Sequence, residues 1–421
     1  MPSVVAPVTN GTTKPYKVLV VGGSYAGLTS ALILLDLCHG RSPRLVPTET
    51  PVSTQQIPVE VTIVDERDGF FHLIGTPVAL ASEEAAPKFW KKFSDIPALK
   101  TAPGLRCVHG SVESIDCGRK AAKIVKHGSV KSYEETYDFL VVASGLRRVW
   151  PTVPQSRTEK EYLKEALDHI KLVESADKGV VVVGGGAVGI EMAAEIKEHF
   201  PTLDVKLIHS RGRLLSAEDL PDDFAEAAAT LLGEVGVDVV LGQRVTKTRE
   251  LAPTLQELTL SNGKTLQASI VISAISRITS TSSFLPGSAL DKEGYVKVSS
   301  NMNLLPEIPN HTHHYAAGDI VRWSGIKRAG AAMHMGQMAA RNIHQRMLND
   351  LGLLRAGKEM KFTELTPVPP MMGLSVGHLG ACYSPDEGTK SGEDIRKLFF
   401  GDDMGFSICW NYMRLGEEFG L

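Results

Sequence analysis

Two glycine-rich turns, each between an apolar strand and a helix, constrain this chain more than any other feature. The second runs from residue 180 to 191 as Val-Val-Val-Val-Gly-Gly-Gly-Ala-Val-Gly-Ile-Glu. Four β-branched residues predict a strand buried on both faces, and Met192 to His199 predicts the following helix. The spacing G-x-G-x-x-G, formed by Gly184, Gly186 and Gly189, permits a tight turn, close approach of a pyrophosphate and close helix packing. We therefore expect a dinucleotide whose phosphates lie at the helix N-terminus, rather than a plain glycine turn.

The first turn follows the strand that begins at residue 17, and Leu28 to Leu37 predicts its helix. Ser24 stands where the spacing requires the second glycine, but its small side chain still admits phosphate and offers a hydroxyl ligand. Two such units in one chain indicate two nucleotides, or one nucleotide and one flavin. The expected cofactor-binding residues of this turn are Gly22, Gly23, Ser24, Ala26 and Gly27.

The residue at the end of the second strand of each unit is expected to meet the ribose. In the first unit the strand 59–66 presents Asp65, after a proline-containing loop over residues 41–58. In the second unit the strand 205–210 offers His209 or Ser210 instead of an acid, with Arg211 and Arg213 just beyond. A strand end of this kind tolerates or favours a 2′-phosphate. The alternative, that the two arginines are only a solvated pair, explains the sequence equally well.

Further turns are expected near the same cofactors. Residues 139–144 predict a buried strand that leads into Ala143, Ser144 and Gly145, and residues 270–275 predict its counterpart in the second unit. A short strand that ends in Gly318 and Asp319 precedes a helix from about Ala329 to Met347. Helices are also expected over residues 157–176 and 217–234. Residues 82–87 predict a helix, residues 88–96 predict a polar turn, and His72 is expected to be structural.

Composition excludes several classes of protein. The 421 residues suffice for two or three domains, and a net charge of −3 gives no basic field for nucleic acid. The sequence contains no run of about 18 apolar residues, so no transmembrane segment is predicted. The N-terminus resembles neither a signal peptide nor a mitochondrial presequence, so residues 1–14 are expected to be a flexible tail of a cytoplasmic protein. The five cysteines lack C-x-x-C spacing, and no metal site is predicted.

These turns, in this order and spacing, resemble the flavoprotein reductases with two dinucleotide domains. Within them the chain is similar to the apoptosis-inducing-factor-like branch, which includes ferroptosis-suppressor-type and type II NADH:quinone oxidoreductase relatives, and its long first crossover resembles fungal members. The resemblance covers residues 15 to 415 and implies FAD on the first unit, with Asp65 on the adenosine ribose and Asp319 on the ribityl chain. NAD(P)H would lie on the second unit, with Glu191 as the catalytic residue near nicotinamide and flavin.

The expected fold is therefore α/β, with two Rossmann-like units and a C-terminal α+β capping domain. The FAD domain would comprise residues 15–150 and 268–345, the NAD(P)H domain residues 151–267, and the cap residues 346–421. The chain departs from the family at residues 273–275, Ser-Ala-Ile, where alanine, threonine and glycine are usual. It also lacks the dithiol of the disulfide reductases.

Three functions remain open from the sequence. The first is an NAD(P)H oxidoreductase that reduces a quinone or a similar small two-electron acceptor. The second is a redox tailoring enzyme of a fungal secondary-metabolite pathway. The third is a death-signalling or nucleotide-sensing flavoprotein with incidental turnover. Peripheral contact with a membrane, association with mitochondria and the oligomeric state stay undecided.

Overall fold

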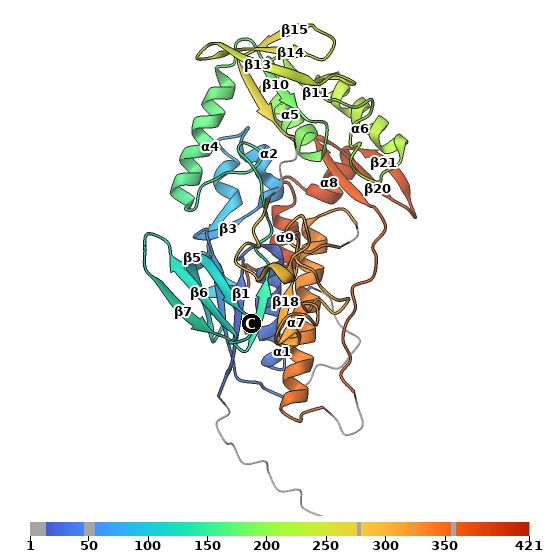
Figure 1. Ribbon diagram of the computed structural model, residues 1–421. Coiled ribbons are helices and arrows are strands. Elements are labelled where there is room, and N and C mark those ends of the chain that lie inside the picture. The colour runs from blue at the N-terminus through green and yellow to red at the C-terminus, as the bar shows by residue number, and fades with distance from the viewer. Residues whose placement is uncertain (1–13, 46–54, 276–278, 324, 355–358, 421) are drawn as a thin grey trace, which may run out of the picture.

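The computed structural model describes residues 14–45, 55–275, 279–323, 325–354 and 359–420, and Figure 1 shows their arrangement. Two parallel-sheet units lie one above the other in this view, and the C-terminal segment runs alongside both. The predicted N-terminal tail, apart from Lys14, and the middle of the predicted loop 41–58 lie outside the described residues. The expected α/β class, with two Rossmann-like units and a cap, is confirmed.

The first unit is a seven-stranded sheet in the order β18-β8-β1-β2-β5-β6-β7. Strands β18, β8, β1, β2 and β5 are parallel, whereas β5, β6 and β7 form antiparallel hairpins. Their bounds are β1 Tyr16–Val21, β2 Val59–Asp65, β5 Leu105–Asp116, β6 Ala121–Lys126, β7 Ser132–Thr136, β8 Phe139–Val142 and β18 His314–Ala316. Because the central strands are parallel and in register, their carboxyl ends meet at one edge, where ligands of open α/β sheets bind.

Helix α1 (Tyr25–Cys38) is buried over its whole length, as its apolar composition on all sides requires. It lies between the sheet and helix α7 (Ala329–Asp350), with which it makes extensive contact. Gly336 permits this close approach, because a Cβ there would lie 2.4 Å from the carbonyl oxygen of Ala26. Helix α7 thus joins a late part of the chain to the first glycine turn.

The second unit is a parallel sheet in the order β12-β11-β10-β16. Alternate residues of these strands enter two different cores. One face packs on helices α5 and α6, and the other packs on an antiparallel sheet of β13, β14 and β15. The bounds are β10 Val180–Val183, α5 Ala187–His199, β11 Val205–Ile208, α6 Asp222–Glu234, β12 Asp238–Val240, β13 Val245–Ala252, β14 Leu255–Leu260, β15 Thr265–Ala268 and β16 Ile270–Ser273.

Two crossovers join the units, and they pair with each other through β9 (Leu146–Arg147) and β17 (Thr279–Ser280). Helix α4 (Glu159–Glu174) follows the first crossover. The C-terminal segment contributes an antiparallel sheet and two helices: β19 Met372–Val376, β20 Leu379–Ser384, β21 Gly388–Gly392, α8 Glu393–Phe400 and α9 Phe406–Tyr412. Its sheet packs in the core of the second unit, whereas Cys409, Met413 and Leu415 belong to the core of the first.

Three expectations for local structure need correction. The helix predicted over residues 217–234 begins only at Asp222, because Pro221 precedes it with extended backbone and Asp222 and Asp223 form its first turn. The polar turn predicted over residues 88–96 contains β4 (Trp90–Lys92), which pairs with β3 (Gly69–Phe71). The predicted helix over residues 82–87 is reduced to a 3₁₀ turn over Ala86–Phe89.

Within the described ranges, no helix combines the length and apolar character that crossing a bilayer requires. The same part of the chain contains no group of three or more histidine, cysteine or acidic side chains placed to hold a metal ion.

Candidate active site

The first glycine turn lies at the carboxyl end of β1 and opens helix α1. Gly22 adopts φ +110°, and a Cβ there would lie 2.4 Å from the carbonyl oxygen of Ala143, so only glycine fits. A Cβ at Gly27 would lie 1.8 Å from the oxygen of Gly22, which explains the close packing of helix on strand. Ser24 is the N-cap residue, and its hydroxyl caps none of the helix N–H groups. These N–H groups face the turn, as a phosphate site requires.

Asp65 stands at the end of β2, as the sequence predicts. Its Oδ2 accepts a hydrogen bond of 2.6 Å from the N–H of Gly23, and its Oδ1 accepts one of 2.7 Å from Arg67. Loss of hydration raises the pKa of the Asp65 carboxyl, although these two N–H donors and the Arg67 charge oppose the rise. The carboxylate is thus fixed beside the glycine turn.

The other predicted turns of the first unit converge on the same edge. Ala143 follows β8 directly against Gly22, and Ser144 accepts a hydrogen bond of 2.8 Å from Thr281 of the second crossover. Gly318 adopts φ +82°, and a Cβ there would lie 3.1 Å from the methyl group of Ala26 in the first turn of α1. Asp319 therefore lies next to the opening of α1.

Two cations beside Asp319 were missed from the sequence. The guanidinium of Arg148 lies 3.8 Å from Oδ2 of Asp319, and the Lys327 ammonium donates a bond of 2.7 Å to the carbonyl oxygen of Asp319. Both residues lie in irregular segments between predicted elements, where neither periodicity nor spacing singles out one basic residue. Arg148 lies in the first crossover and Lys327 between β18 and α7, so their shared position becomes visible only in the folded chain.

The second glycine turn repeats this geometry. A Cβ at Gly184 would lie 2.7 Å from the oxygen of Ala274, and a Cβ at Gly189 would lie 1.9 Å from the oxygen of Gly184. Gly186 is the N-cap of α5, is exposed, and has nothing within 4 Å of an added Cβ. The open space above Gly186 and the helix N-terminus fits a pyrophosphate, and the residues present therefore fit a dinucleotide.

The end of β11 carries no carboxylate. Nδ1 of His209 accepts the N–H of Gly185 at 3.1 Å, and its Nε2 lies 2.9 Å from Oγ of Ser216. Arg211 is exposed, and its guanidinium forms no ion pair with a described residue. Arg213, in contrast, binds Asp222 at 2.8 Å and the carbonyl oxygen of Leu220 at 3.0 Å. The two arginines that look alike in the sequence therefore differ, and only Arg211 is available to a ligand.

Glu191, the expected catalytic residue, lies on α5 and is buried against β19. Its Oε1 accepts the backbone N–H of Ser375 at 3.4 Å, while the Ser375 hydroxyl donates to Oε1 of Glu195 at 3.3 Å. Burial raises the pKa of Glu191 to about 8 and that of Glu195 to about 7. The Ser375 N–H and the charges of Arg396 and Arg148 oppose this rise in the pKa of Glu191.

Both ring nitrogens of His72, which is expected to be structural, have partners within the protein. Its Nδ1 lies 3.0 Å from the Tyr25 hydroxyl, and its Nε2 lies 2.8 Å from the carbonyl oxygen of Met404. Burial lowers the pKa of His72 to about 4, so it is a neutral link between the first unit and the C-terminal segment.

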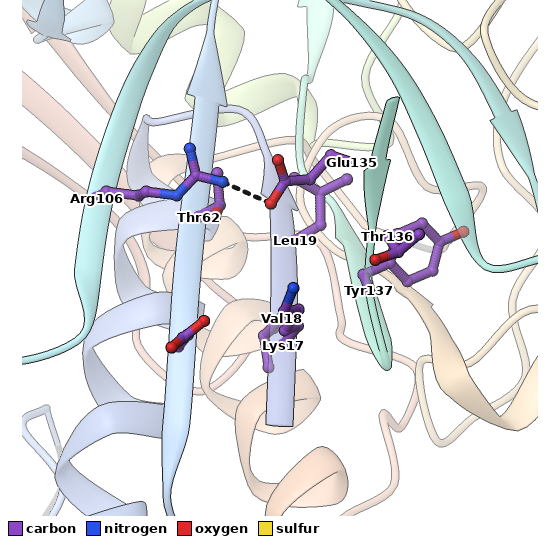
Figure 2. A pocket seen from close by; sticks show the side chains of 9 residues that line it. Lys17, Val18, Leu19, Thr62, Arg106, Glu135, Thr136 and Tyr137 are labelled. Atoms are coloured by element: carbon purple, nitrogen blue, oxygen red, sulfur yellow. Dashed lines mark hydrogen bonds and ion pairs between the residues drawn. The ribbon is translucent and has the colours of Figure 1, made fainter. Parts of the chain in front are cut away.

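A hollow in the first sheet lies apart from these turns. Figure 2 shows Lys17, Thr62, Arg106 and Glu135 among its lining, with Arg106 and Glu135 joined by an ion pair of 2.5 Å. Lys17 lies near the amino end of β1, whereas the glycine turn follows the carboxyl end. This hollow is therefore not part of the candidate site.

All five cysteines are free thiols. Burial raises the pKa of Cys38, Cys107 and Cys409 to about 12 and that of Cys117 to about 11, and it also raises that of Cys382. Almost none of these thiols is ionised at neutral pH, and the thiolate is the reactive form.

Two parallel-sheet units, each with a glycine turn at a helix N-terminus, define a protein with two dinucleotide-binding units, as in the flavoprotein reductases. Residues 16–336 match the pyridine nucleotide-disulphide oxidoreductases, and the chain belongs to that family. Its cofactors are accordingly FAD and NAD(P)H.

Individual relatives agree with this assignment. Oxidoreductase OXR1 of Ajellomyces capsulatus is 50% identical over 420 residues, which cover 97% of this chain and 90% of that protein. Ferroptosis suppressor protein 1 of Xenopus tropicalis is 24% identical over 380 residues, which cover 87% and 89%. The water-forming NADH oxidase from Lactobacillus brevis, solved with NADH, shares the fold with a TM-score of 0.62 and 19% identity, over 87% of this chain and 74% of that one. The expected resemblance is confirmed.

Proposed function

We propose that this protein oxidises NAD(P)H and reduces a quinone-like small molecule, with FAD as the electron carrier between them. The observation that carries the proposal is that each of the two units has its own glycine turn. The crossovers that join these units pair with each other. Bound FAD supplies the two-electron chemistry that a hydride donor and a quinone require.

We assign the FAD site to residues 15–150 and 268–345. There the glycine turn and the N-terminus of α1 bind phosphate, Asp65 binds the adenosine ribose, and Asp319 binds the ribityl hydroxyls. The small residues Ala143, Ser144, Gly145 and Gly318 leave room for the cofactor. The NAD(P)H site occupies residues 151–267, with Gly184, Gly186 and Gly189 at the pyrophosphate and Arg211 at the ribose. Residues 346–421 cover the acceptor site.

Glu191 is assigned to the junction of the two sites. The overall reaction takes NAD(P)H, one proton and a quinone to NAD(P)⁺ and a quinol, so a proton must be supplied besides the hydride. Because burial raises its pKa to about 8, the Glu191 carboxyl holds a proton at neutral pH and is suited to supply it. Arg148, which lies 3.8 Å from Asp319 in the first unit, is one of the cations whose charge acts on this carboxyl.

The free, un-ionised cysteines support a direct exit of electrons to the acceptor. A disulfide reductase needs two thiols close enough to form a disulfide, and the sequence contains no C-x-x-C pair. A redox tailoring enzyme and a signalling flavoprotein would also work without a C-x-x-C pair. The identity of the electron acceptor therefore distinguishes these functions from quinone reduction.

The test is an anaerobic titration of the purified protein, followed in the visible spectrum. We expect a yellow protein that bleaches with NADPH or NADH and regains its colour when a soluble short-chain quinone is added. A colourless protein that takes up no FAD on reconstitution would refute the proposal. If NADPH or NADH bleaches the protein but several quinones fail to restore its colour, only the assignment of a quinone as the acceptor is wrong.

A further inference from the structure

The two units repeat the same backbone contacts around their glycine turns. The N–H of Gly22 donates to the carbonyl oxygen of Val64 at 2.8 Å, and the N–H of Gly184 donates to that of Ile208 at 2.9 Å. Val64 and Ile208 each lie opposite the last residue of the first strand of their unit. The residues that follow them therefore occupy equivalent places in the two units.

At this place the first unit has Asp65 and the second has His209. Both side chains accept a hydrogen bond from the middle glycine of their turn, Gly23 at 2.6 Å and Gly185 at 3.1 Å. The accepting atom is bonded to Cγ in both side chains, Oδ2 in the aspartate and Nδ1 in the histidine, so the two have the same reach. The histidine thus makes the contact of the aspartate without its negative charge.

The surroundings of His209 fix its tautomer. Because Nδ1 accepts the Gly185 N–H, the ring proton lies on Nε2, which donates to Oγ of Ser216 at 2.9 Å. Burial and the charge of Arg211 lower the pKa of His209, which agrees with a neutral ring. Leu215 donates its N–H to the carbonyl oxygen of Gly185 at 2.8 Å. The segment after β11 therefore holds the turn at both its N–H and its carbonyl group.

We propose that His209 is a positioning residue that holds the second glycine turn in place for the pyrophosphate. Because it is uncharged, it also leaves the adenosine 2′ position open to a phosphate. The inference rests on the proposed nucleotide site of the second unit and is independent of the acceptor. Its ligand class is a 2′-phosphorylated adenine dinucleotide. Arg211, which forms no ion pair with the residues that the structure describes, is a nearby cation for the 2′-phosphate.

Three substitutions separate the two roles. His209→Leu removes the acceptor for Gly185. His209→Asn keeps an acceptor on Cγ but lacks the counterpart of Nε2. His209→Asp keeps the acceptor and adds the charge that Asp65 has in the first unit. Dissociation constants of NADPH and NADH are measured by anaerobic fluorescence titration of proteins whose bound flavin has first been reduced with dithionite, so that no hydride transfer occurs. FAD content and unfolding temperature verify the fold.

We expect His209→Leu to weaken NADPH and NADH alike by about 2- to 10-fold, the loss of one hydrogen bond, and His209→Asn to restore both. His209→Asp should keep NADH binding and weaken NADPH by about 10- to 100-fold. Unchanged affinities in His209→Leu, or no rescue by asparagine, would overturn the positioning role. An unchanged ratio of NADPH to NADH affinity in His209→Asp would overturn the role in specificity. Failure of quinone reduction alters neither measurement.

Discussion

Arg211 and Arg213 are two residues apart, but within the described part of the chain only the side chain of Arg213 forms an ion pair. Since the Arg211 guanidinium is exposed and has no ion pair among the described residues, it can bind a 2′-phosphate without first losing a contact. We predict that Arg211→Ala weakens NADPH by about 10- to 100-fold, the range for charge-assisted bonds, and leaves NADH nearly unchanged. Arg213→Ala is the matched control, because Asp222 neutralises that arginine. Equal effects of both substitutions on NADPH affinity would contradict the assignment.

Asp319 is the second residue with a testable role. If its carboxylate accepts hydrogen bonds from the ribityl hydroxyls, its removal leaves these hydroxyls unpaired and costs roughly 1 to 3 kcal/mol of FAD affinity. Asp319→Ala should therefore purify with much less flavin than the unaltered protein, as measured by the absorbance ratio of flavin to protein. Full flavin occupancy in this variant would rule out the role. Asp350, at the far end of α7, provides a control carboxylate on the same unit.

Glu191 and Glu195 predict a pH dependence of stability. An unfolded glutamate ionises near 4.5, whereas the folded protein keeps both protons until about pH 7 to 8. Between these values the folded state binds more protons than the unfolded state, so stability falls as pH rises from about 4.5 to about 8. Glu195→Gln should make this fall shallower in urea unfolding at a series of pH values. A slope equal to that of the unaltered protein would show that Glu195 ionises normally.

At the scale of elements, the strands and helices around both turns could be predicted because apolar runs and glycine spacing are local signals. The ends of elements were less certain: α1 starts at Tyr25 rather than Leu28, and β16 ends at Ser273. Trp90 and Phe93 illustrate a deeper limit. They are interleaved with polar residues, so the sequence predicts a turn at these positions. In the structure both side chains are buried, and Phe93 lies against Gly23. Such contacts depend on the packing of distant segments.

The glycines of the helices provide a matched pair of substitutions. Gly189→Ala places a methyl group 1.9 Å from a backbone oxygen, so the turn must shift, and we expect about 1 to 3 kcal/mol of destabilisation with impaired NAD(P)H binding. Gly233→Ala, on the exposed face of α6, meets nothing within 4 Å and should stabilise by about 0.5 to 1 kcal/mol. Denaturant unfolding measures both, and a harmless Gly189→Ala would contradict the close packing.

At the scale of the whole molecule, the sequence predicted both dinucleotide units, but not how the C-terminal segment binds them together. Its aromatic and apolar residues show no single period, because β19 to β21 face the second unit while α9 faces the first. The link between Ser375 and the glutamates of α5 was therefore missed, as was Arg148. Both depend on contacts between segments far apart in the chain.

The five cysteines are spread over the whole molecule, and together they allow one prediction. With every thiol un-ionised and none paired, electrons should reach the acceptor without a thiol relay. A variant with all five replaced by alanine or serine should keep quinone reduction within about 3-fold, provided that its flavin content is normal. Loss of quinone reduction while NADPH still bleaches the flavin would reveal a relay. Single replacements would then identify the thiol.

The order of the strands in the first sheet also bears on how the protein is made. β18 pairs with β8 at the edge of that sheet, but it is encoded after every strand of the second unit. As the chain leaves the ribosome at about 5 to 20 residues per second, β8 has an open edge until residues 314–316 emerge. The sheet whose first strand is synthesised first thus gains its last strand only after the inserted parallel sheet has all its strands.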